Sequence, residues 1–542
     1  MRRLLALSLF FVLFINKGFS QTFTSSNLPI IIINTNGQTI PDEPKITADM
    51  GIIFNAGNAR NNMTDAFNHY NGKIGIEIRG QSSQMFPMKS YSIELRDIAG
   101  ASQDKLLFGL PKESDWVLYA PYTDKTLMRN FLAYTMSREL GHWAANCRFV
   151  EVVLNGNYIG IYVFMEKIKR GSGRVNIVKM APTDISGDAV TGGYIFSLDK
   201  EPDGWYSSYV APGSTTGNKR RFSYVYPKIE NIVQQQKDYI KNYVDSFENA
   251  LAGLQFQDPI IGVRKFADMP SFIDYFIVNE ISRNVDGYRL SSFFYKDRNS
   301  KNSKIVAGPV WDYDLAFRNA NYCSGSDIMG WAYKFNEVCP GDGAGLIPFW
   351  WDRFMEDTAF KANLRCRWKQ VRNTSLSTSR INALIDSIAN LVNEARQRHF
   401  QRWPVLGQYI WPNPQPIPAT YDGEIASLKS WINARLEWID KNLPNTGGCY
   451  DYPAERKESI IVSINPNPLQ GKGTFVIQSR FDQPLSMQVS DAMGRIVQSK
   501  QIQLRGGINT IDLNSDRWAT GIYFISIRSS NGDKFVKKVF KN

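Results

Sequence analysis

Hydrophobic and polar residues alternate along much of the first two hundred positions, which is the pattern of β-strands with one buried face. Residues 73–79 alternate, a polar turn follows, and residues 89–95 alternate again, so we predict a β-hairpin. A second hairpin is predicted around Asn155-Gly156, a pair favoured in two-residue turns, with strands over 149–154 and 158–164. This part of the chain is therefore expected to consist mainly of sheet.

Helices are predicted between the two hairpins and throughout the second half of the chain. Asp124 is a suitable N-cap for a helix that ends at Gly141. A proline near its start and apolar residues at helical spacing predict a helix over 270–284. Further amphipathic helices are predicted over 234–254, 381–402 and 425–443. This order, sheet first and helices second, predicts an α+β fold with a cleft between two lobes.

Both ends of the chain carry patterns of their own. Two arginines precede the apolar run 4–15, and small residues before Gln21 complete the pattern of a signal peptide over residues 1–20. The run is too short for a membrane anchor, so we expect export and a mature chain that begins at Gln21. From about residue 456 the pattern changes to short alternating strands separated by turns, which predicts a small β-sandwich over 456–542.

Composition and charge exclude several classes of protein. The 542 residues carry a net charge of +12, but basic residues are spread along the chain, so the charge does not indicate nucleic-acid binding. Only three histidines occur, without the spacing of metal ligands, which excludes an H-E-x-x-H zinc site and haem chemistry that needs several histidines. The five cysteines include no C-x-x-C motif. They form one or two disulfides, with Cys323–Cys339 the nearest pair, or they remain mostly buried thiols.

Three aspartates form the densest candidate site. Asp286 follows the predicted helix 270–284, and a strand, a polar turn and a second strand then lead to Asp312 and Asp314. In extended backbone these last two side chains, two positions apart, share one face. Carboxylates that converge repel one another unless a cation binds, and oxygen ligands without histidine suit Mg²⁺ or Mn²⁺. A loop carboxylate, a hairpin and a metal-binding carboxylate, in this order, is the plan of protein kinases.

Several sequence blocks around these aspartates resemble one protein family. The blocks are Arg79-Gly80-Gln81-Ser82-Ser83, Lys89-Ser90-Tyr91, Trp116 to Tyr122, Arg129-Asn130, Asn155 to Tyr162, Glu166-Lys167, Gly192-Gly193-Tyr194, and Asp286 with Trp311-Asp312-Tyr313-Asp314. In this order they make residues 28–440 similar to the spore-coat protein H (CotH) kinases, a secreted, atypical branch of the protein-kinase-like fold. The resemblance implies a kinase-like domain over 21–455, with a β-rich N-lobe over about 28–200 and a helical C-lobe over about 230–445.

The resemblance also implies roles for the three aspartates. Asp286 would be the catalytic base that orients a substrate hydroxyl, and Asp312 would bind Mg²⁺ or Mn²⁺ on the phosphates of ATP. Asp314 is either a second metal ligand or a partner for a nearby N–H or arginine group. Many relatives carry asparagines shortly after the catalytic aspartate, where this chain has Ser291 and Ser292, and serine is a poorer metal ligand.

For the nucleotide, the resemblance points to residues of the β-rich part. Lys89 is the basic residue expected to meet the phosphates, and a structural salt bridge is the alternative for a lysine on a buried strand face. No G-x-G-x-x-G or G-x-x-x-x-G-K-[ST] motif exists, so phosphate binding would use the turn with Ser82 and Ser83 and its backbone N–H groups. Glu166 would lie near the adenine, and Arg129-Asn130 on the early helix either position Lys89 or face solvent.

The C-terminal strands resemble a second known unit. Four features occur in order: the turn Asn465 to Pro468, the turn Asp491 to Arg495, the strand motif Trp518 to Tyr523 and the basic stretch Lys534 to Lys541. This order is similar to the type A C-terminal sorting domain of the type IX secretion system of Bacteroidetes. The resemblance implies contact with the secretion machinery, passage across the outer membrane, and a final location outside the cell or on its surface. No transmembrane segment is expected in the mature chain.

Three functions are compatible with these observations. The first is a secreted kinase that transfers the γ-phosphate of ATP to Ser or Thr of a secreted or surface protein, with Mg²⁺ or Mn²⁺. The second takes Asp312-x-Asp314 as the D-x-D motif of a nucleotide-sugar transferase, although no βαβ alternation precedes it. The third is a surface scaffold or adhesin whose kinase-like fold does not catalyse a reaction.

Overall fold

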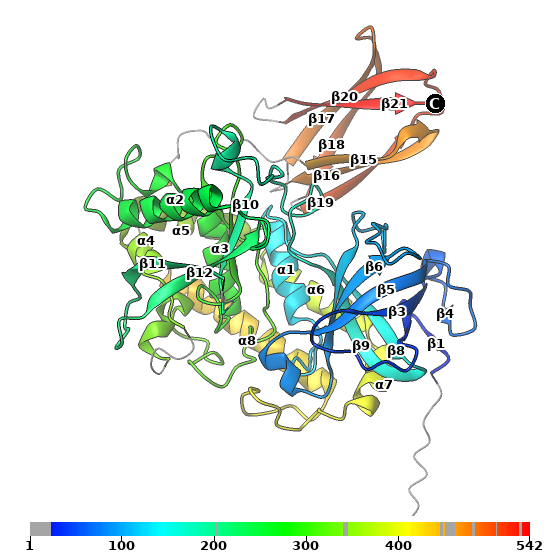
Figure 1. The fold of residues 1–542 in the computed structure, drawn as a ribbon, viewed down its shortest axis with the longest axis horizontal. Helices are drawn as coiled ribbons and strands as arrows, with labels where there is room; N and C mark the ends of the chain where they lie inside the picture. The colour runs from blue at the N-terminus through cyan, green and yellow to red at the C-terminus, as the bar shows by residue number, and fades with distance from the viewer. Residues whose placement is uncertain are drawn as a thin grey trace, which may run out of the picture.

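The computed structural model describes residues 23–200, 203–339, 345–444, 448–449, 461–479, 483–505, 507–529 and 534–542. The predicted signal peptide over 1–20 and the predicted start at Gln21 lie outside these residues. The described chain is α+β, as predicted: it consists of a β-barrel, a second sheet with the helices, and a C-terminal group of strands (Figure 1). Among the described residues, no helix is both long enough and apolar enough to cross a membrane.

Seven strands close into a barrel, drawn in blue and cyan in Figure 1. In barrel order they are β2 (Ile30–Asn34), β3 (Ile46–Ile53), β5 (Tyr70–Arg79), β6 (Ser90–Arg96), β7 (Asp115–Tyr119), β9 (Asn157–Glu166) and β8 (Cys147–Leu154). Neighbours are antiparallel except β2 and β8, whose parallel pairing closes the barrel. Both predicted hairpins are present, as β5–β6 and β8–β9. Apolar side chains from every strand form the barrel core, because alternate residues face inward.

Strands, a helix and further strands follow one another along the chain in the predicted order, but the strands form one closed barrel rather than two sheets. The strands before and after helix α1 (Arg129–Glu139) belong to the same barrel, since β7 pairs with β9. The helix itself begins later than predicted, and Asp124 is not its N-cap. Leu127 has a left-handed φ of 66°, which an α-helix cannot contain. The Asp124 carboxylate instead forms a buried ion pair with Arg129.

The second sheet is antiparallel and has the order β11 (Gly204–Val210), β12 (Lys219–Tyr226), β10 (Tyr194–Leu198), β13 (Ser292–Lys296) and β14 (Ile305–Ala307). The helices are α2 (Gln234–Ala252), α3 (Met269–Ser282), α4 (Trp350–Glu356), α5 (Thr358–Arg372), α6 (Thr378–Leu391), α7 (Ala395–Arg402) and α8 (Tyr421–Asn442). A short pair, β1 (Ser25–Ser26) and β4 (Asn61–Asn62), lies outside both sheets. Helix α3 is buried along almost its whole length and forms the centre of the core between the second sheet and the helices.

One predicted helix is divided in two. The segment expected to be helical over 381–402 forms α6 and α7 with a turn between them, where Glu394 pairs with Arg60 at 2.6 Å. The chain changes direction there, so that α7 packs against β9 of the barrel. In this contact Nδ1 of the buried His399 accepts a hydrogen bond of 3.1 Å from the N–H of Ile161. Helix α7 therefore fastens the helical part to the barrel.

The short C-terminal strands predicted from alternation are present, in orange and red in Figure 1. They are β15 (Ile461–Gln470), β16 (Lys472–Ser479), β17 (Gln483–Asp491), β18 (Ile496–Leu504), β19 (Gly507–Asn514), β20 (Gly521–Ser529) and β21 (Lys534–Lys541). β15, β16 and β19 pair in one group and the other four in a second group, with Leu469 opposite Lys541 where the groups meet. Their apolar side chains form a core separate from those of the rest of the chain.

Disulfides join four of the five cysteines, a question that the sequence left open. Cys323 and Cys339 are bonded, as the nearest pair in sequence. A second disulfide links Cys366 on α5 to Cys449, which follows α8 and lies 83 positions away. Cys147 on β8 is a free, buried thiol.

Candidate active site

One cavity brings together the three aspartates and the serine turn that the sequence predicted. It measures about 510 Å³, and Asp286, Asp312, Asp314, Ser82 and Ser83 all line it. The other lining residues are Arg79, Gly80, Gln81, Phe86, Ser90, Val117, Tyr119, Thr123, Tyr134, Met165, Asp199, Lys200, Leu290, Ser291, Trp311, Leu315, Tyr322, Trp411 and Pro412. Because barrel strands and loops of the helical part both contribute, the cavity lies between these two parts of the fold.

A single side chain links the two loops that carry the aspartates. Helix α3 ends at Ser282, and its C-cap residue Arg283, with a left-handed φ of 46°, turns the chain into the Asp286 loop. The Oδ1 atom of Asn284 accepts a hydrogen bond of 3.3 Å from the N–H of Asp286. Its Nδ2 atom donates one of 3.1 Å to the carbonyl oxygen of Asp312. One planar amide group therefore fixes the positions of Asp286 and Asp312 relative to each other.

Helix α1 holds the Asp312 loop from the opposite side. The Oδ1 atom of Asn130 accepts a hydrogen bond of 2.6 Å from the N–H of Tyr313, and the Tyr134 hydroxyl accepts one of 3.1 Å from the N–H of Asp312. Arg129 Nε donates a bond of 3.1 Å to the carbonyl oxygen of Ala316. Both alternatives considered for Arg129 and Asn130 are thus wrong, because these buried side chains hold the carboxylate loop.

The backbone at Asp312 differs from the extended conformation that the sequence analysis assumed. Asp312 has a left-handed φ of 64°, which is uncommon for residues other than glycine, although aspartate tolerates it better than most. The side chains of Asp312 and Asp314 therefore reach the same cavity because the chain turns, and not because they alternate along a strand. Left-handed residues of this kind are often found at functional sites, where neighbouring contacts hold them in place.

The cavity raises the pKa of all three carboxyl groups. Burial, followed by the charge of Asp286, raises the pKa of Asp312 to about 6, while the nearby Arg79 guanidinium opposes the shift. Burial and the charges of Asp312 and Asp286 raise the pKa of Asp314 well above its usual range. Burial also raises the pKa of Asp286, with Arg289 acting in the opposite direction. The cavity thus concentrates negative charge that a bound cation would stabilise.

The donor set suits magnesium only in part. Among the described residues, no group of three or more His, Cys, Asp or Glu side chains has the arrangement of a metal site. Asp312 and Asp314, however, line one cavity, carry raised pKa values and have oxygen donors. Mg²⁺ usually keeps several waters and is held by one or two carboxylates together with substrate phosphates. These two residues could therefore hold Mg²⁺ or Mn²⁺ once a nucleotide supplies the remaining oxygens.

Two cationic side chains that the sequence analysis did not single out for this role line the cavity. The guanidinium of Arg79 lies 5.6 Å from the ring centroid of Trp311, and no group of the described residues bonds its buried Nη1 atom. Lys200 follows β10, and its charge opposes the raised pKa of Asp286 and of Asp312. Arg79 belongs to the Arg79–Ser83 motif, in which the two serines were the residues expected to bind phosphate. It is the last residue of the alternating strand β5. Which cation faces the cavity depends on how the barrel docks on the helices.

Lys89 and Glu166 are not among the residues that line the cavity. The ammonium group of Lys89 donates a hydrogen bond to the carbonyl oxygen of Gln84, whose Nε2 donates one of 2.6 Å to the carbonyl oxygen of Gly80. Lys89 therefore braces the serine turn from outside. Glu166 is fully buried, and one of its oxygens accepts bonds of 2.9 and 2.8 Å from the N–H and Nδ2 of Asn146. Its neighbour on β9, Met165, faces the cavity because adjacent residues of a strand point in opposite directions.

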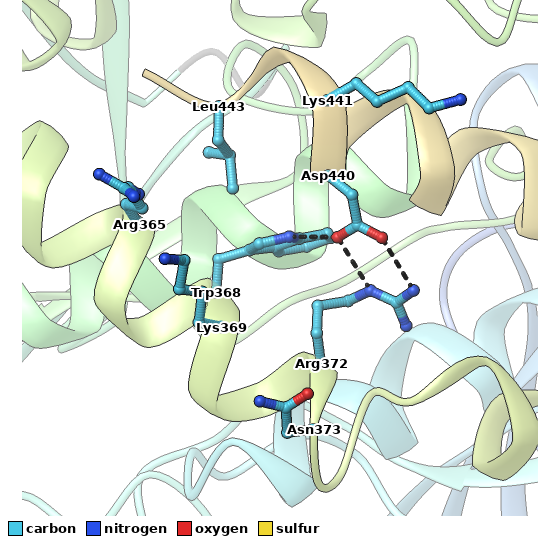
Figure 2. A pocket seen from close by; sticks show the side chains of 8 residues that line it. All are labelled: Arg365, Trp368, Lys369, Arg372, Asn373, Asp440, Lys441 and Leu443. Carbon is cyan, nitrogen blue, oxygen red and sulfur yellow. Dashed lines mark hydrogen bonds and ion pairs between the residues drawn. The ribbon is translucent and has the colours of Figure 1, made fainter. Parts of the chain in front are cut away.

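A second concavity of about 510 Å³ lies between α5 and α8 and contains none of the predicted site residues (Figure 2). Asp440 lines it, and its carboxylate accepts a hydrogen bond of 2.7 Å from Trp368 Nε1. The same carboxylate pairs with Arg372 at 3.1 Å, as the dashed lines in Figure 2 show. Asp440 thus joins two helices, and it offers a control position outside the candidate site.

The model of the family described as CotH kinase protein matches residues 76–439, which is more than half of the chain. The chain belongs to the CotH kinase family. The model described as secretion system C-terminal sorting domain matches residues 463–542. No curated protein matches the chain.

The match to the CotH kinase family contains every residue discussed above for the cavity. It begins on β5 just before Arg79 and ends on α8 at Ile439. The sorting domain covers nearly all of β15 and every later strand, and it indicates type IX secretion to the cell surface or beyond it. The CotH domain and the sorting domain are thus two separate parts of one exported chain.

Proposed function

We propose that this CotH-family protein is a secreted kinase that transfers the γ-phosphate of ATP to Ser or Thr of a secreted or surface protein. The observation that carries the proposal is the meeting of Asp286, Asp312 and Asp314 in one cavity with the Arg79–Ser83 turn. We assign the β-barrel to the N-lobe of a kinase-like arrangement and the second sheet with the helices to the C-lobe. ATP would bind between them, where the cavity lies.

In this proposal Asp286 is the catalytic base. It lies on a short loop after α3, and Asn284 holds its backbone. A carboxylate at this place orients the acceptor hydroxyl and takes its proton as the phosphoryl group is transferred. Burial raises the pKa of Asp286, and the positive charge of Arg289 limits that rise. Ser291, on the same loop, also lines the cavity.

Asp312 and Asp314 would hold Mg²⁺ or Mn²⁺. The metal, when bound, neutralises negative charge on the nucleotide phosphates. The chain contributes two carboxylates in a loop that Asn130, Tyr134 and Asn284 hold in place. Such preorganised positions mean that little reordering is needed when substrate binds, which is how positioning lowers the barrier of phosphoryl transfer.

The phosphates would meet Arg79, Lys200 and the Ser82–Ser83 turn. Arg79 offers a buried N–H group that no described residue bonds, and the turn offers backbone N–H groups. Lys89 would act indirectly, by holding the turn through Gln84. For the adenine we propose the apolar wall that contains Val117 and Met165, with Glu166 behind it rather than in contact with the base.

The test is phosphate transfer by the mature chain, residues 21–542, with γ-labelled ATP and Mg²⁺ or Mn²⁺. We expect label on the protein or on a generic Ser/Thr acceptor, and a loss of about a hundredfold or more in Asp286→Asn and Asp312→Ala. Chelation of the metal should abolish the label. Asp440→Asn, which removes an aspartate outside the cavity, should keep wild-type transfer.

Label that persists in both site variants would show that the site is misplaced. Binding of ATP without transfer would instead identify a scaffold with a kinase-like fold. Transfer of the sugar from a nucleotide sugar with release of the nucleoside diphosphate, abolished by Asp312→Ala, would identify the glycosyltransferase considered from the Asp312-x-Asp314 motif.

A further inference from the structure

A disulfide and the proposed catalytic base are connected by one buried arginine. The side chain of Arg289 is 1% exposed, and its Nη2 atom lies 4.0 Å from Oδ1 of Asp286. The same guanidinium contacts both sulfur atoms of the Cys323–Cys339 disulfide: Nη1 is 3.4 Å from Sγ of Cys339, and Nη2 is 3.7 Å from Sγ of Cys323. Arg289 therefore lies between the disulfide and the carboxylate.

Among the described residues, the other contacts of Arg289 are uncharged or cationic, so Asp286 is the carboxylate that faces its charge. Its Nη1 donates a hydrogen bond of 3.3 Å to the carbonyl oxygen of Gly345, and its own carbonyl accepts one of 2.6 Å from Arg220. Arg220 is itself a buried cation, whose pKa is lowered to about 10 by burial and by Arg289. Disulfide sulfurs are weak, uncharged acceptors, so they locate the guanidinium without neutralising it. Its positive charge is thus available to the Asp286 carboxylate.

The disulfide also fixes the loop that forms one wall of the cavity. Tyr322 precedes Cys323 directly and lines the cavity, where burial and, after it, the charge of Asp286 raise the pKa of the phenol above its usual range. Past Cys323 the loop is anchored by Arg283, whose Nε donates a bond of 3.0 Å to the carbonyl oxygen of Ser324. The covalent bond to Cys339 therefore determines where this wall and Arg289 lie together.

We propose that Arg289 is a positioning residue for Asp286 and that the Cys323–Cys339 disulfide holds Arg289 in place. The inference rests on the proposed function for its kinetic test, and on the structure alone for its thermal test. In this proposal the Cys323–Cys339 disulfide contributes to the geometry of the active site, in addition to stabilising the fold.

The kinetic test compares Arg289→Gln and Arg289→Lys in the mature chain with wild type. Arg289→Gln should lower kcat by about tenfold or more while KM for ATP stays within about twofold, because the base is displaced and the nucleotide contacts are not. Arg289→Lys restores the charge and should recover part of the lost kcat. A KM that rises together with the fall in kcat, or a lysine variant no better than glutamine, would overturn the positioning role.

The chain offers a matched control for the disulfide. The double variant Cys323→Ser/Cys339→Ser should lose about tenfold in kcat at a temperature well below its melting temperature. Cys366→Ser/Cys449→Ser removes the other disulfide, which does not contact Arg289, and should keep wild-type kcat under the same conditions. Equal kcat values for the two double variants would contradict the inference. If the first double variant does not fold, Arg289→Gln with both disulfides intact carries the test.

A thermal double-mutant cycle separates this inference from the proposed function. Melting temperatures are measured for Arg289→Gln, Asp286→Asn and the combination, with no substrate present. Coupled residues should give a combined loss smaller by about 2 °C or more than the sum of the single losses. If wild type transfers no phosphate but the losses are coupled, only the proposed function fails. Additive losses overturn the contact between Arg289 and Asp286.

Discussion

The hydroxyl of Tyr313 donates a hydrogen bond of 2.9 Å to Oδ1 of Asn279, in the buried core of helix α3. Tyr313 stands between Asp312 and Asp314, and its side chain is buried in the core while both neighbouring residues line the cavity. Asn279 is itself held by a bond of 3.0 Å from its Nδ2 to the carbonyl oxygen of Tyr275. The carboxylate loop is thus anchored to the most buried helix of the CotH domain.

This anchor predicts the effect of Tyr313→Phe. Removal of the hydroxyl leaves Oδ1 of Asn279 without this donor in a buried place, which should lower the free energy of unfolding by about 1–2 kcal/mol. Phosphate transfer should fall as well, because the loop loses one support. Urea unfolding and the transfer assay measure the two effects. Tyr206→Phe, at a position that is 57% exposed, should change neither quantity.

Asn279 also limits which residue can occupy position 287, directly after Asp286. A Cβ atom at Gly287 would lie 2.4 Å from Oδ1 of Asn279 and 2.9 Å from the carbonyl oxygen of Asn284. Gly287→Ala should therefore displace the Asp286 loop and lower phosphate transfer by about tenfold or more, with a loss of about 1–3 kcal/mol in stability. Gly171→Ala, where a Cβ meets nothing within 4 Å, is the control and should behave as wild type. Wild-type transfer in Gly287→Ala would show that the loop accommodates the methyl group.

His399 predicts a loss of stability in acid. Burial lowers its pKa to about 3, and its Nδ1 must stay unprotonated to accept the bond from Ile161. As pH falls below the ordinary value of 6.5, the unfolded chain takes up a proton that the folded chain does not. Stability should thus fall by about 2 kcal/mol between pH 7 and pH 5 through this residue. Urea unfolding of His399→Asn at both pH values should show a smaller difference than wild type, and an equal difference would refute the assignment.

Glu248 predicts the opposite dependence. Burial raises its pKa to about 7, although Trp350 Nε1 and the Ser207 hydroxyl donate bonds of 2.9 and 2.8 Å to the carboxylate. The folded chain therefore holds a proton that the unfolded chain releases near 4.5. Stability should fall by about 2 kcal/mol as pH rises from 5 to 8 through this residue. Glu248→Gln should weaken that dependence in urea unfolding, while Glu356→Gln, at an exposed position, should leave it unchanged.

Local patterns predicted the elements better than their arrangement. The Asn155-Gly156 hairpin was predictable because both turn residues take positive φ, of 49° and 77°, as a tight hairpin requires. Barrel closure was not, because it depends on parallel pairing between β2 and β8, which lie more than a hundred positions apart. The start of α1 was also missed, since nothing in the local sequence reveals the left-handed φ of Leu127.

In the candidate site, too, features set by the order of residues along the chain were predictable, and features set by the packing of distant parts were not. The order of Asp286, Asp312 and Asp314 along the chain was enough to place them in one cavity. Which cation faces them was not predictable, because Lys89 and Arg79 both lie near the serine turn and only the docking of barrel and helices distinguishes them. The part played by Arg289 depends on a disulfide that the sequence left undecided.

The second disulfide has a mechanical consequence for a chain whose sorting domain lies at its C-terminal end. Cys449 lies beyond α8 and is bonded to Cys366 on α5, ahead of the strands of the sorting domain. Tension applied to the sorting domain therefore reaches the CotH domain first at a covalent crosslink, and it passes into the side of α5. Helix α8 is bypassed, so a pull on the sorting domain would not peel α8 away from the CotH domain.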